Sequence, residues 1–364
     1  MARPLSNPEL ERQLLNLIFT SGRNVAARAT ETFGLSRQAI NKHLRDLVRQ
    51  GTIRATGSTR SRRYELSQME VNRTFALAGL AEHDVWEEFV RPYFAELREN
   101  VRRICQYGVT EMVNNAIDHS EGTSVLIILL LNPVRISINV YDNGVGIFKK
   151  IRKAFQLPTE SEVMLELSKG KLTTDPARHS GEGIFFTSRI FDQYSLYAGS
   201  LFFIHFPDND DWLLERAEAP ITGTWVSMEL DPASPKELTE VFDRFAAPEQ
   251  YHFDVTHVPV KLAQLGEDSI VSRSQAKRLV ARFERFSRVV LNFAGVETIG
   301  QAFADEVFRV FRREHPRIDL RWINTSEAVE RMIQRAIAGG ENERAANGGT
   351  GGGIGESSPP TGQT

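Results

Sequence analysis

The stretches EMVNNAIDHS (residues 111–120), VYDNGVGI (140–147) and HSGEGI (179–184) decide the fold of this chain. In the first stretch, apolar residues recur at three- and four-residue spacing, which predicts a helix. Glu111, Asn115 and Asp118 are then expected on its opposite, polar face. A carboxylate followed one turn later by an amide suits a magnesium nucleotide, because the amide oxygen can bind a hard cation and the carboxylate can polarise a water.

The second and third stretches add two glycine-rich turns. Gly144 and Gly146 allow positive φ after an apolar strand at residues 134–141, so the backbone can pass beneath a flat ring while Asp142 accepts a hydrogen bond. Gly181 and Gly183 precede an amphipathic helix at residues 184–191, whose free N–H groups can bind a phosphate. Taken alone, the first stretch is also typical of a solvated helix face, the second of a hairpin turn and the third of an ordinary helix start. Their order and spacing favour a nucleotide site.

Together the three stretches resemble the N, G1 and G2 boxes of the Bergerat-fold (GHKL) ATPases, a superfamily that includes gyrase, MutL and the histidine and anti-sigma-factor kinases. The resemblance covers about residues 80–230, and Gly223-Thr224 is similar to the family's adenine-side threonine. It implies an α/β sandwich, a mixed sheet with helices on one face, over residues 75–232. It also implies ATP and Mg²⁺ as cofactors.

The resemblance assigns a role to each matching residue. Glu111 would activate water or accept a proton, and Asn115 would bind Mg²⁺. The other ATP-binding positions that it implies are Asp118, Asp142, Gly144, Gly146, Lys150, His179, Gly181, Gly183 and Thr224. His179 stands where the family usually has a glycine, which leaves hydrolysis open. Residues 148–178 would form the ATP lid, a loop that orders over the nucleotide; its basic residues are otherwise explained as a solvated surface.

Composition indicates a globular protein of two or three domains. The chain has 364 residues, of which 41% are hydrophobic and 25% charged, and its net charge is −3. The apolar run at residues 125–131 is too short for a membrane span, and the first residues do not have the pattern of a secretion signal. Cys105 is the single cysteine, so no disulfide framework is predicted. We expect a cytoplasmic protein with no membrane partner.

Residues 1–68 form a basic module. Residues 1–66 contain twelve Lys and Arg against five Asp and Glu, a balance of +7, which leaves −10 for the rest of the chain. Helices are predicted at residues 9–19, 24–32 and 37–50, the last capped by Ser36, and a short hairpin at residues 52–66. This arrangement resembles a winged helix-turn-helix domain, the kind found in many bacterial transcription regulators.

The winged-helix resemblance implies double-stranded DNA as a partner. The third helix would enter the major groove, where Arg pairs with guanine and Asn or Gln with adenine. The DNA-binding residues predicted on this basis are Arg37, Gln38, Asn41 and Lys42 on the helix and Arg60, Arg62 and Arg63 on the wing. The alternative is that the module mediates protein contacts and that its basic residues are only solvated.

The C-terminal part is predicted to contain a connector at 233–256 and a small α/β domain at 257–338. Residues 339–364 are rich in glycine and polar residues and are predicted to form a disordered tail. The sequence VVLNFAGVETIGQAFADE (289–306) resembles the core of STAS-like domains, the relatives of anti-sigma-factor antagonists. In phosphorylated antagonists a serine begins the helix after this strand. Here Gly300-Gln-Ala occupies that place, and Thr298 is the nearest hydroxyl. We therefore expect this domain to dock a partner without being phosphorylated.

Three functions are compatible with these predictions. The first is a DNA-binding regulator, working as a homodimer, whose Mg-ATP site controls the winged-helix and STAS-like modules, with slow hydrolysis left open. The second is a serine/threonine kinase of the anti-sigma-factor type that phosphorylates a STAS-domain partner. The third is a regulator in which ATP is only a structural ligand. A sensor histidine kinase is disfavoured because His83 is not framed by a dimerising helical hairpin.

Overall fold

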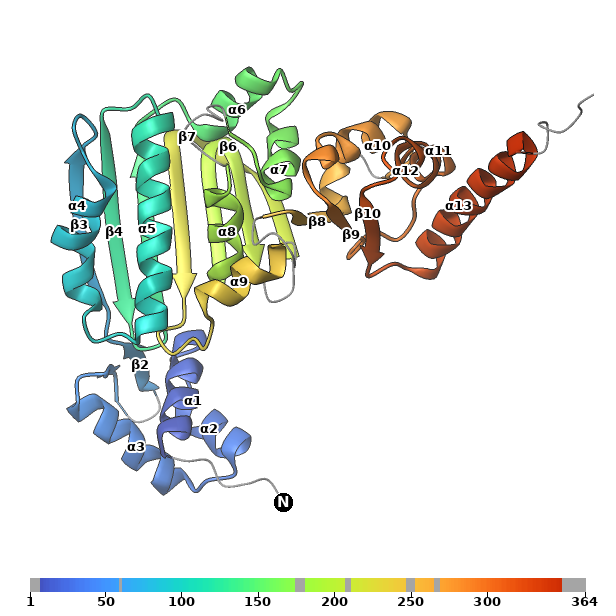
Figure 1. Ribbon diagram of the computed structural model, residues 1–364. Helices are drawn as coiled ribbons and strands as arrows, with labels where there is room; N and C mark the ends of the chain where they lie inside the picture. The colour runs from blue at the N-terminus through green and yellow to red at the C-terminus, as the bar shows by residue number, and fades with distance from the viewer. Residues whose placement is uncertain are drawn as a thin grey trace, which may run out of the picture. The chain divides into compact units, whose positions relative to one another are not determined.

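The computed structural model describes residues 7–58, 61–173, 181–206, 211–246, 253–264 and 269–348. The chain divides into two compact units, Met1–Phe245 and Ala246–Thr364. Both units mix helices with strands (Figure 1). The first unit contains the basic head and the three stretches at residues 111–120, 140–147 and 179–184. The second unit contains the STAS-like sequence.

The basic head consists of three helices and a hairpin. The helices are α1 (Asn7–Thr20), α2 (Val25–Phe33) and α3 (Arg37–Arg49), and the hairpin pairs β1 (Ile53–Thr56) with β2 (Arg63–Leu66) in antiparallel register. Ser36 caps α3 as predicted, because its side chain accepts a hydrogen bond from the Ala39 N–H. Leu14, Ile40 and Leu44 form the centre of a fully buried core. The predicted elements of the head are thus all present.

A five-stranded sheet forms the body of the first unit. Its strands are β3 (Met69–Ala76), β4 (Ser124–Asn132), β5 (Arg135–Asp142), β6 (Gln193–Phe206) and β7 (Asp211–Leu230), in the order β3-β4-β5-β7-β6. Each described pairing is antiparallel, so the prediction of a mixed sheet was wrong. The reason is topological: β3, β4 and β5 pair in sequence order, and β6 and β7 pair with each other and join the sheet through β7 beside β5, antiparallel at each step.

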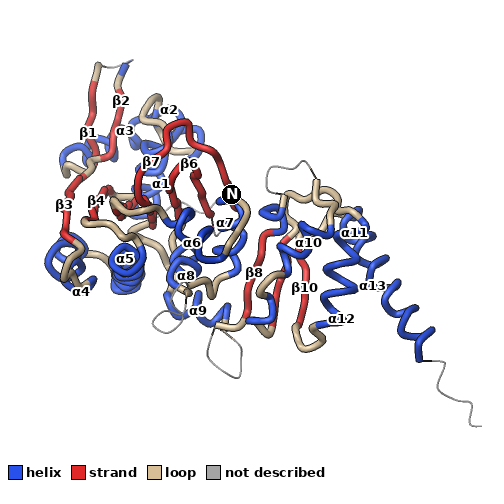
Figure 2. The backbone as a smooth tube through the Cα atoms, turned by 90° about the horizontal axis from the view of Figure 1, so that it is seen from above, coloured by secondary structure: helices blue, strands red, loops and turns tan. Residues whose placement is uncertain are grey.

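Helices cover one face of this sheet (Figure 2). This layer contains the long helix α5 (Glu99–His119), the short helix α8 (Gly183–Ile190) and α9 (Leu238–Phe245). Before α5, the short helix α4 (Glu82–Val85) continues into a π-helical turn, Trp86–Val90, and a 3-10 turn, Arg91–Phe94. Val125, Ile127 and Leu129 alternate with half-buried residues along β4 and are fully buried. That alternation shows which face of the sheet carries the core.

The segment expected to be a lid loop is largely helical. It contains α6 (Ile147–Phe155) and α7 (Glu160–Lys169). Phe148 and Ile151 are buried on α6, and Val163 and Leu167 on α7, each pair at three- or four-residue spacing. The basic residues of α6 and the glutamates of α7 hid this periodicity in the sequence. The prediction of a loop was therefore wrong up to Lys169, and residues 174–180 lie outside the described part.

The second unit contains a parallel sheet of strands β8 (Val255–Pro259), β9 (Arg288–Asn292) and β10 (Asp319–Ile323), in the order β10-β9-β8. Its helical segments are Val260–Ala263, α10 (Arg273–Val280), Phe283–Arg285, α11 (Gln301–Asp305), Glu306–Phe311, α12 (Arg312–Glu314) and α13 (Glu327–Gly348). Helix α10 ends at Val280, and Arg282 shortly after it has φ 66°. Helix α13 continues past the predicted boundary at residue 338, because Glu, Arg and Ala dominate residues 341–346 and favour helix. Residues 349–364 lie outside the described part.

The basic head contacts the sheet within the first unit. Arg12 of α1 forms an ion pair with Asp231, which directly follows β7. The Arg135 guanidinium lies over the Phe19 ring, 4.3 Å from its centroid, and pairs with Glu229 at 2.6 Å. Val134 packs against the hydrophobic core of the head. Charged and apolar contacts therefore join the head to the ends of β5 and β7.

Candidate functional site

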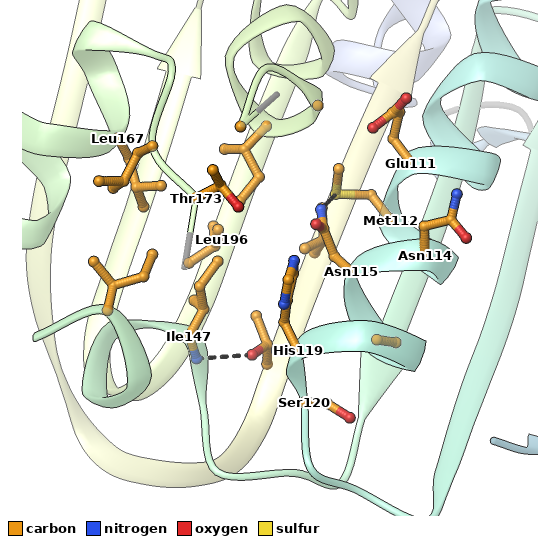
Figure 3. Close-up of a pocket in the computed structure, with 18 of the residues that line it drawn as sticks. Glu111, Met112, Asn114, Asn115, His119, Ser120, Ile147, Leu167, Thr173 and Leu196 are labelled. Atoms are coloured by element: carbon orange, nitrogen blue, oxygen red, sulfur yellow. Dashed lines mark hydrogen bonds between the residues drawn. The ribbon is translucent and has the colours of Figure 1, made fainter. Parts of the chain in front are cut away.

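A cavity of about 260 Å³ lies on the helical face of the first unit, between α5, α6, α8, the end of β5 and the part of β7 around Thr224. Figure 3 shows the α5 wall, from Glu111 to Ser120. Seven of the predicted nucleotide-site residues line the cavity: Glu111, Asn115, Asp142, Lys150, Gly181, Gly183 and Thr224. The structure thus brings residues of the three stretches together with Thr224, although these segments are far apart in the chain.

Asp142 marks one end of the cavity. It is the last residue of β5 and is only 6% exposed. Its Oδ1 accepts hydrogen bonds from the N–H of Gly144 at 2.8 Å and of Thr224 at 3.3 Å. Burial raises the pKa of this carboxyl, and these hydrogen bonds act against the increase. The Thr224 hydroxyl accepts in turn from the Ile147 N–H at 3.1 Å, so Asp142 and Thr224 are fixed as a pair.

Glycines make the close packing at this end possible. A Cβ on Gly144 would overlap the backbone carbonyl of Ser120, and the Val145 N–H donates to that carbonyl at 2.8 Å. Gly146 has φ +84° and lies against the backbone of Gly223. Neither Gly144 nor Gly146 is among the described residues that line the cavity. They position Asp142, whereas the sequence predicted that they would lie beneath the ligand.

Glu111 and Gly183 mark the other end of the cavity. Gly183 is the first residue of α8, and a Cβ added to it would overlap Oε2 of Glu111 and lie 3.1 Å from its Cδ. Glu111 and Ser120 are nine residues apart on α5, so the two ends are about 13 Å apart along the helix axis. The cavity therefore suits an elongated ligand, with a buried hydrogen-bond acceptor at one end and a helix N-terminus at the other.

The electrostatics of this second end are acidic. Burial raises the pKa of Glu111, and the nearby charges of Glu182 and Glu82 raise it further. The pKa of Tyr107 is also raised, by burial first and then by Glu111 and Glu182. Like charges that converge in a half-buried place disfavour each other's ionised form. A proton or a cation at this end would be stabilised.

The middle of the α5 wall differs from the prediction at one position. Asn115 lines the cavity, and Asn114, His119 and Ser120 line it as well. Asp118 is exposed and is not part of the described lining. The loop after β5 packs on Ser120, and at this point of α5 the cavity is lined by His119 and Ser120. The prediction that Asp118 neighbours the ligand is not matched by this geometry.

The described lining also contains polar residues that were not assigned a role from the sequence, among them Asn114, His119 and Glu182. His119 follows Asn115 by one helical turn, a spacing that could have placed it on the same wall. Glu182 lies between Gly181 and Gly183, and the sequence does not predict in which direction its side chain points.

Lys150, on α6, is a basic residue among the described residues that line the cavity. Its Nζ lies 3.0 Å from Oε1 of Glu121, and 21% of its side chain is exposed. A lysine in this position can exchange its carboxylate partner for an anionic ligand, since Glu121 is mostly exposed and water can replace its contact with the lysine. His179 belongs to residues 174–180 and lies outside the described residues, so its predicted role stays a prediction.

The residues predicted to bind DNA lie on the surface of the head. Arg37, Gln38 and Lys42 are exposed at the start of α3, and Asn41 is half-buried among them. Arg62 and Arg63 are exposed at the β2 side of the hairpin. Arg60 lies outside the described residues. The structure therefore leaves the start of α3 and the start of β2 accessible.

Comparison with known families identifies one region of the chain. A family described as a STAS-like domain of unknown function (DUF4325) matches residues 275–330. The match runs from α10 into α13, so the second unit carries a STAS-like region. No curated protein matches the chain. No described helix is both long enough and apolar enough to cross a membrane.

The STAS-like region does not carry a hydroxyl residue at the start of the helix after β9. Gly300 is the N-cap of α11, and the helix begins with Gln301 and Ala302. Thr298 is exposed in the preceding loop. The first turn of this helix therefore presents no serine or threonine for phosphorylation.

Proposed function

We propose that this protein is an ATP-binding regulator of the Bergerat type with a winged-helix DNA-binding head. One observation supports the proposal above all: a single cavity is lined by Glu111, Asn115, Asp142, Thr224 and Gly183, which come from separate segments of the chain. Random polar and glycine-rich stretches have no reason to converge on one cavity. The convergence favours a functional site over three independent surface features.

In this proposal, Mg-ATP would lie in the cavity in a definite direction. Asp142, held by Gly144 and Thr224, would accept a hydrogen bond from the adenine amino group, and Val140, Leu196 and Val226 would form the apolar wall for the ring. The phosphates would lie toward the N-terminus of α8. Bound Mg²⁺ supplies charge neutralisation for the polyphosphate.

The chain's own residues at the phosphate end would then act on water. The Asn115 amide oxygen would hold the cation, and Glu111 would accept a proton from the attacking water. A raised pKa brings a carboxylate closer to the value that suits a general base near neutral pH. The same residues also suit a site that binds ATP and turns it over slowly.

A chain of contacts supports control of the head by this site. Asp192 follows the end of α8, and its Oδ2 accepts from the Asp231 N–H at 2.7 Å. Asp231 is the residue that pairs with Arg12 on α1. A shift of α8 on nucleotide binding would therefore act on the contact that anchors the head. Control at equilibrium requires that ATP bind two conformations with unequal affinity.

DNA binding with and without Mg-ATP tests this function. We expect the affinity for double-stranded DNA to differ at least fivefold between the two conditions, and the Asp142→Asn variant to lose this difference. The salt concentration must be identical in all titrations, because phosphate contacts dominate the affinity. Equal affinities in the wild-type protein would remove the proposed switch.

A second candidate function is a serine/threonine kinase of the anti-sigma-factor type. It is favoured by the STAS-like match at residues 275–330 in the same chain as the proposed ATP site. The first turn of α11 lacks an acceptor hydroxyl, so the substrate would be a separate STAS-domain protein. Incubation with radiolabelled ATP and candidate STAS proteins tests it. The absence of any labelled protein would count against the kinase and leave the regulator.

A further inference from the structure

Another cavity, of about 520 Å³, lies where the basic head joins the sheet. The head contributes residues 50–52, which directly follow α3, and the sheet contributes Met69 of β3 and Leu131 of β4. The chain passes from β2 of the head to β3 of the sheet through Ser67 and Gln68, and both of these residues line the cavity. The cavity is therefore built around the covalent hinge of the head.

The described lining of this cavity carries no charge. Its apolar part consists of Met69, Tyr93, Leu97, Leu131, Ile136 and two prolines. The remaining described lining residues are glycine, serine, threonine, asparagine and glutamine, although 25% of the chain is charged. Met69 is 48% exposed and Tyr93 is 39% exposed, so two large apolar side chains meet solvent here. An apolar ligand that covered them would bind favourably, and an ionic ligand would find no counter-charge in this lining.

Polar side chains are placed to orient such a ligand. The amides of Gln50 and Gln68 and the Tyr93 hydroxyl line the cavity, and they form no hydrogen bond to another described residue. An apolar lining with a few polar groups, in a volume of about 300–1,000 Å³, is typical of small-molecule sites. The described lining is smaller than the roughly 20–30 residues that a stable protein interface uses on each side. The dimensions favour a small molecule over a protein segment.

The position of the cavity connects it to the orientation of the head. The Ser67 N–H donates to the Thr52 carbonyl at 3.0 Å, and the Ser67 hydroxyl donates to the Gly51 carbonyl, so the first linker residue is fixed to the head. Met69 and Leu131 are instead paired with each other in the sheet. A rotation of the head about the linker would therefore change the shape of the cavity, and a ligand that contacts both sides would favour one orientation.

We propose that this cavity binds an uncharged, mainly apolar small molecule and that its occupation changes the affinity of the head for DNA. The cavity ends at Gln50, the residue after α3, which is the helix that we assign to the major groove. The effect on DNA rests on the proposed DNA-binding function, whereas binding of the small molecule does not. Two sites that favour different orientations of one head are coupled, and the coupling is reciprocal.

Titration of the full chain with Nile red, an uncharged dye that fluoresces in apolar surroundings, tests the ligand site. We expect saturable binding of about one dye per chain. Met69→Asp places a charge in the cavity and Thr52→Trp fills it from the head side, so each should weaken dye binding at least about tenfold. Val271→Asp is the matched control, because Val271 is also 48% exposed but belongs to the second unit. Its dye affinity should equal that of the wild type.

Mobility-shift titrations with double-stranded DNA at fixed salt test the coupling. Saturating Nile red should change the DNA affinity of the wild-type protein at least about fivefold, and DNA should change the dye affinity by the same factor. Thr52→Trp should lose the response of DNA affinity to the dye. The measured quantity is the ratio of DNA affinities with and without dye, so a direct effect of the substitution on DNA binding cancels.

The outcomes separate this inference from the proposed function. Dye binding within twofold of wild type in both Met69→Asp and Thr52→Trp would overturn the cavity as the ligand site. Dye binding that both variants lose, with no effect of dye on DNA affinity, would overturn the coupling. A wild-type protein that binds no DNA with or without dye would overturn the DNA-binding function and the coupling together, whereas the dye titrations decide the ligand site by themselves.

Discussion

Gly183 and Glu111 are packed so closely that a side chain at position 183 would have to displace the Glu111 carboxylate. A Cβ there would overlap Oε2 of Glu111 and lie 3.1 Å from its Cδ. Gly183 begins α8 and Glu111 lies on α5, two elements separated by some seventy positions of sequence. This contact defines the end of the cavity at which we place the phosphates.

Gly183→Ala should disable the site without unfolding the protein. The new methyl group would displace the Glu111 carboxylate and obstruct the N-terminus of α8, so we expect Mg-ATP affinity to fall at least tenfold. Gly339→Ala is the matched control, because a Cβ at that position of α13 meets no atom within 4 Å. Titration of both variants with Mg-ATP makes the comparison. Wild-type affinity in Gly183→Ala would show that ligand does not use this end of the cavity.

Glu111→Ala should separate binding from chemistry. If Glu111 is the base that takes a proton from water, the variant loses hydrolysis by about a hundredfold or more and keeps Mg-ATP binding within a few-fold. A phosphate-release assay and a binding titration on the same sample measure both. Unchanged hydrolysis would remove the catalytic role assigned to Glu111.

Glu111→Gln should stabilise the protein more at pH 7 than at pH 4. Burial and the neighbouring Glu182 raise the pKa of Glu111 in the folded state above its ordinary value of 4.5. The folded state therefore holds this proton more tightly than the unfolded state, and wild-type stability falls as pH rises from about 4.5 through the raised pKa. The amide removes that cost. Thermal unfolding in the absence of nucleotide measures it, and each 1 kcal/mol gained would appear as about 2–4 °C.

A pH-independent difference between Glu111→Gln and wild type would contradict the raised pKa. Glu121→Gln is a useful comparison with the opposite sign. A hydrogen bond and ion pair with Lys150 lower the pKa of the exposed Glu121, so its replacement should bring no stabilisation at pH 7.

Substitutions at the start of α3 should weaken DNA binding in two distinct ways. Arg37→Ala, if Arg37 reads a base, should cost about 1–3 kcal/mol on the preferred sequence and less on others. Lys42→Ala, if Lys42 contacts a phosphate, should weaken binding to all sequences and reduce the salt dependence by about one ion. Arg91→Ala, which removes a charge paired with Glu87 outside the head, should change neither. Equal DNA affinity in all three variants would favour a protein-docking role for the head.

Much of the fold could be predicted because its signals are local. Ser36 and the apolar spacing of Ile40 and Leu44 specify α3, and a long apolar run specifies β4. Strand β3 was not predicted, since it lies at the sheet edge and buries only Phe75 well, so its residues do not alternate. Helices α6 and α7 were predicted as a loop because charged residues are interspersed among their apolar positions.

The site was predictable to the extent that its residues belong to recurring blocks. Glu111, Asn115, Asp142 and the glycines of the third block could be placed together from their order in the chain. The direction of Glu182 and the contribution of His119 depend on how α8 and the loop after β5 pack against α5. Such packing is set by contacts between distant segments, and the sequence alone does not encode it in any short pattern.

Isothermal titration of the full chain with Mg-ATP tests the proposed nucleotide site. We expect saturable binding of about one nucleotide per chain, and Asp142→Asn should weaken it at least tenfold by removing the charge of the buried acceptor that we propose for the adenine amino group. No saturable binding of Mg-ATP at millimolar concentration, or identical binding by Asp142→Asn, would contradict the account.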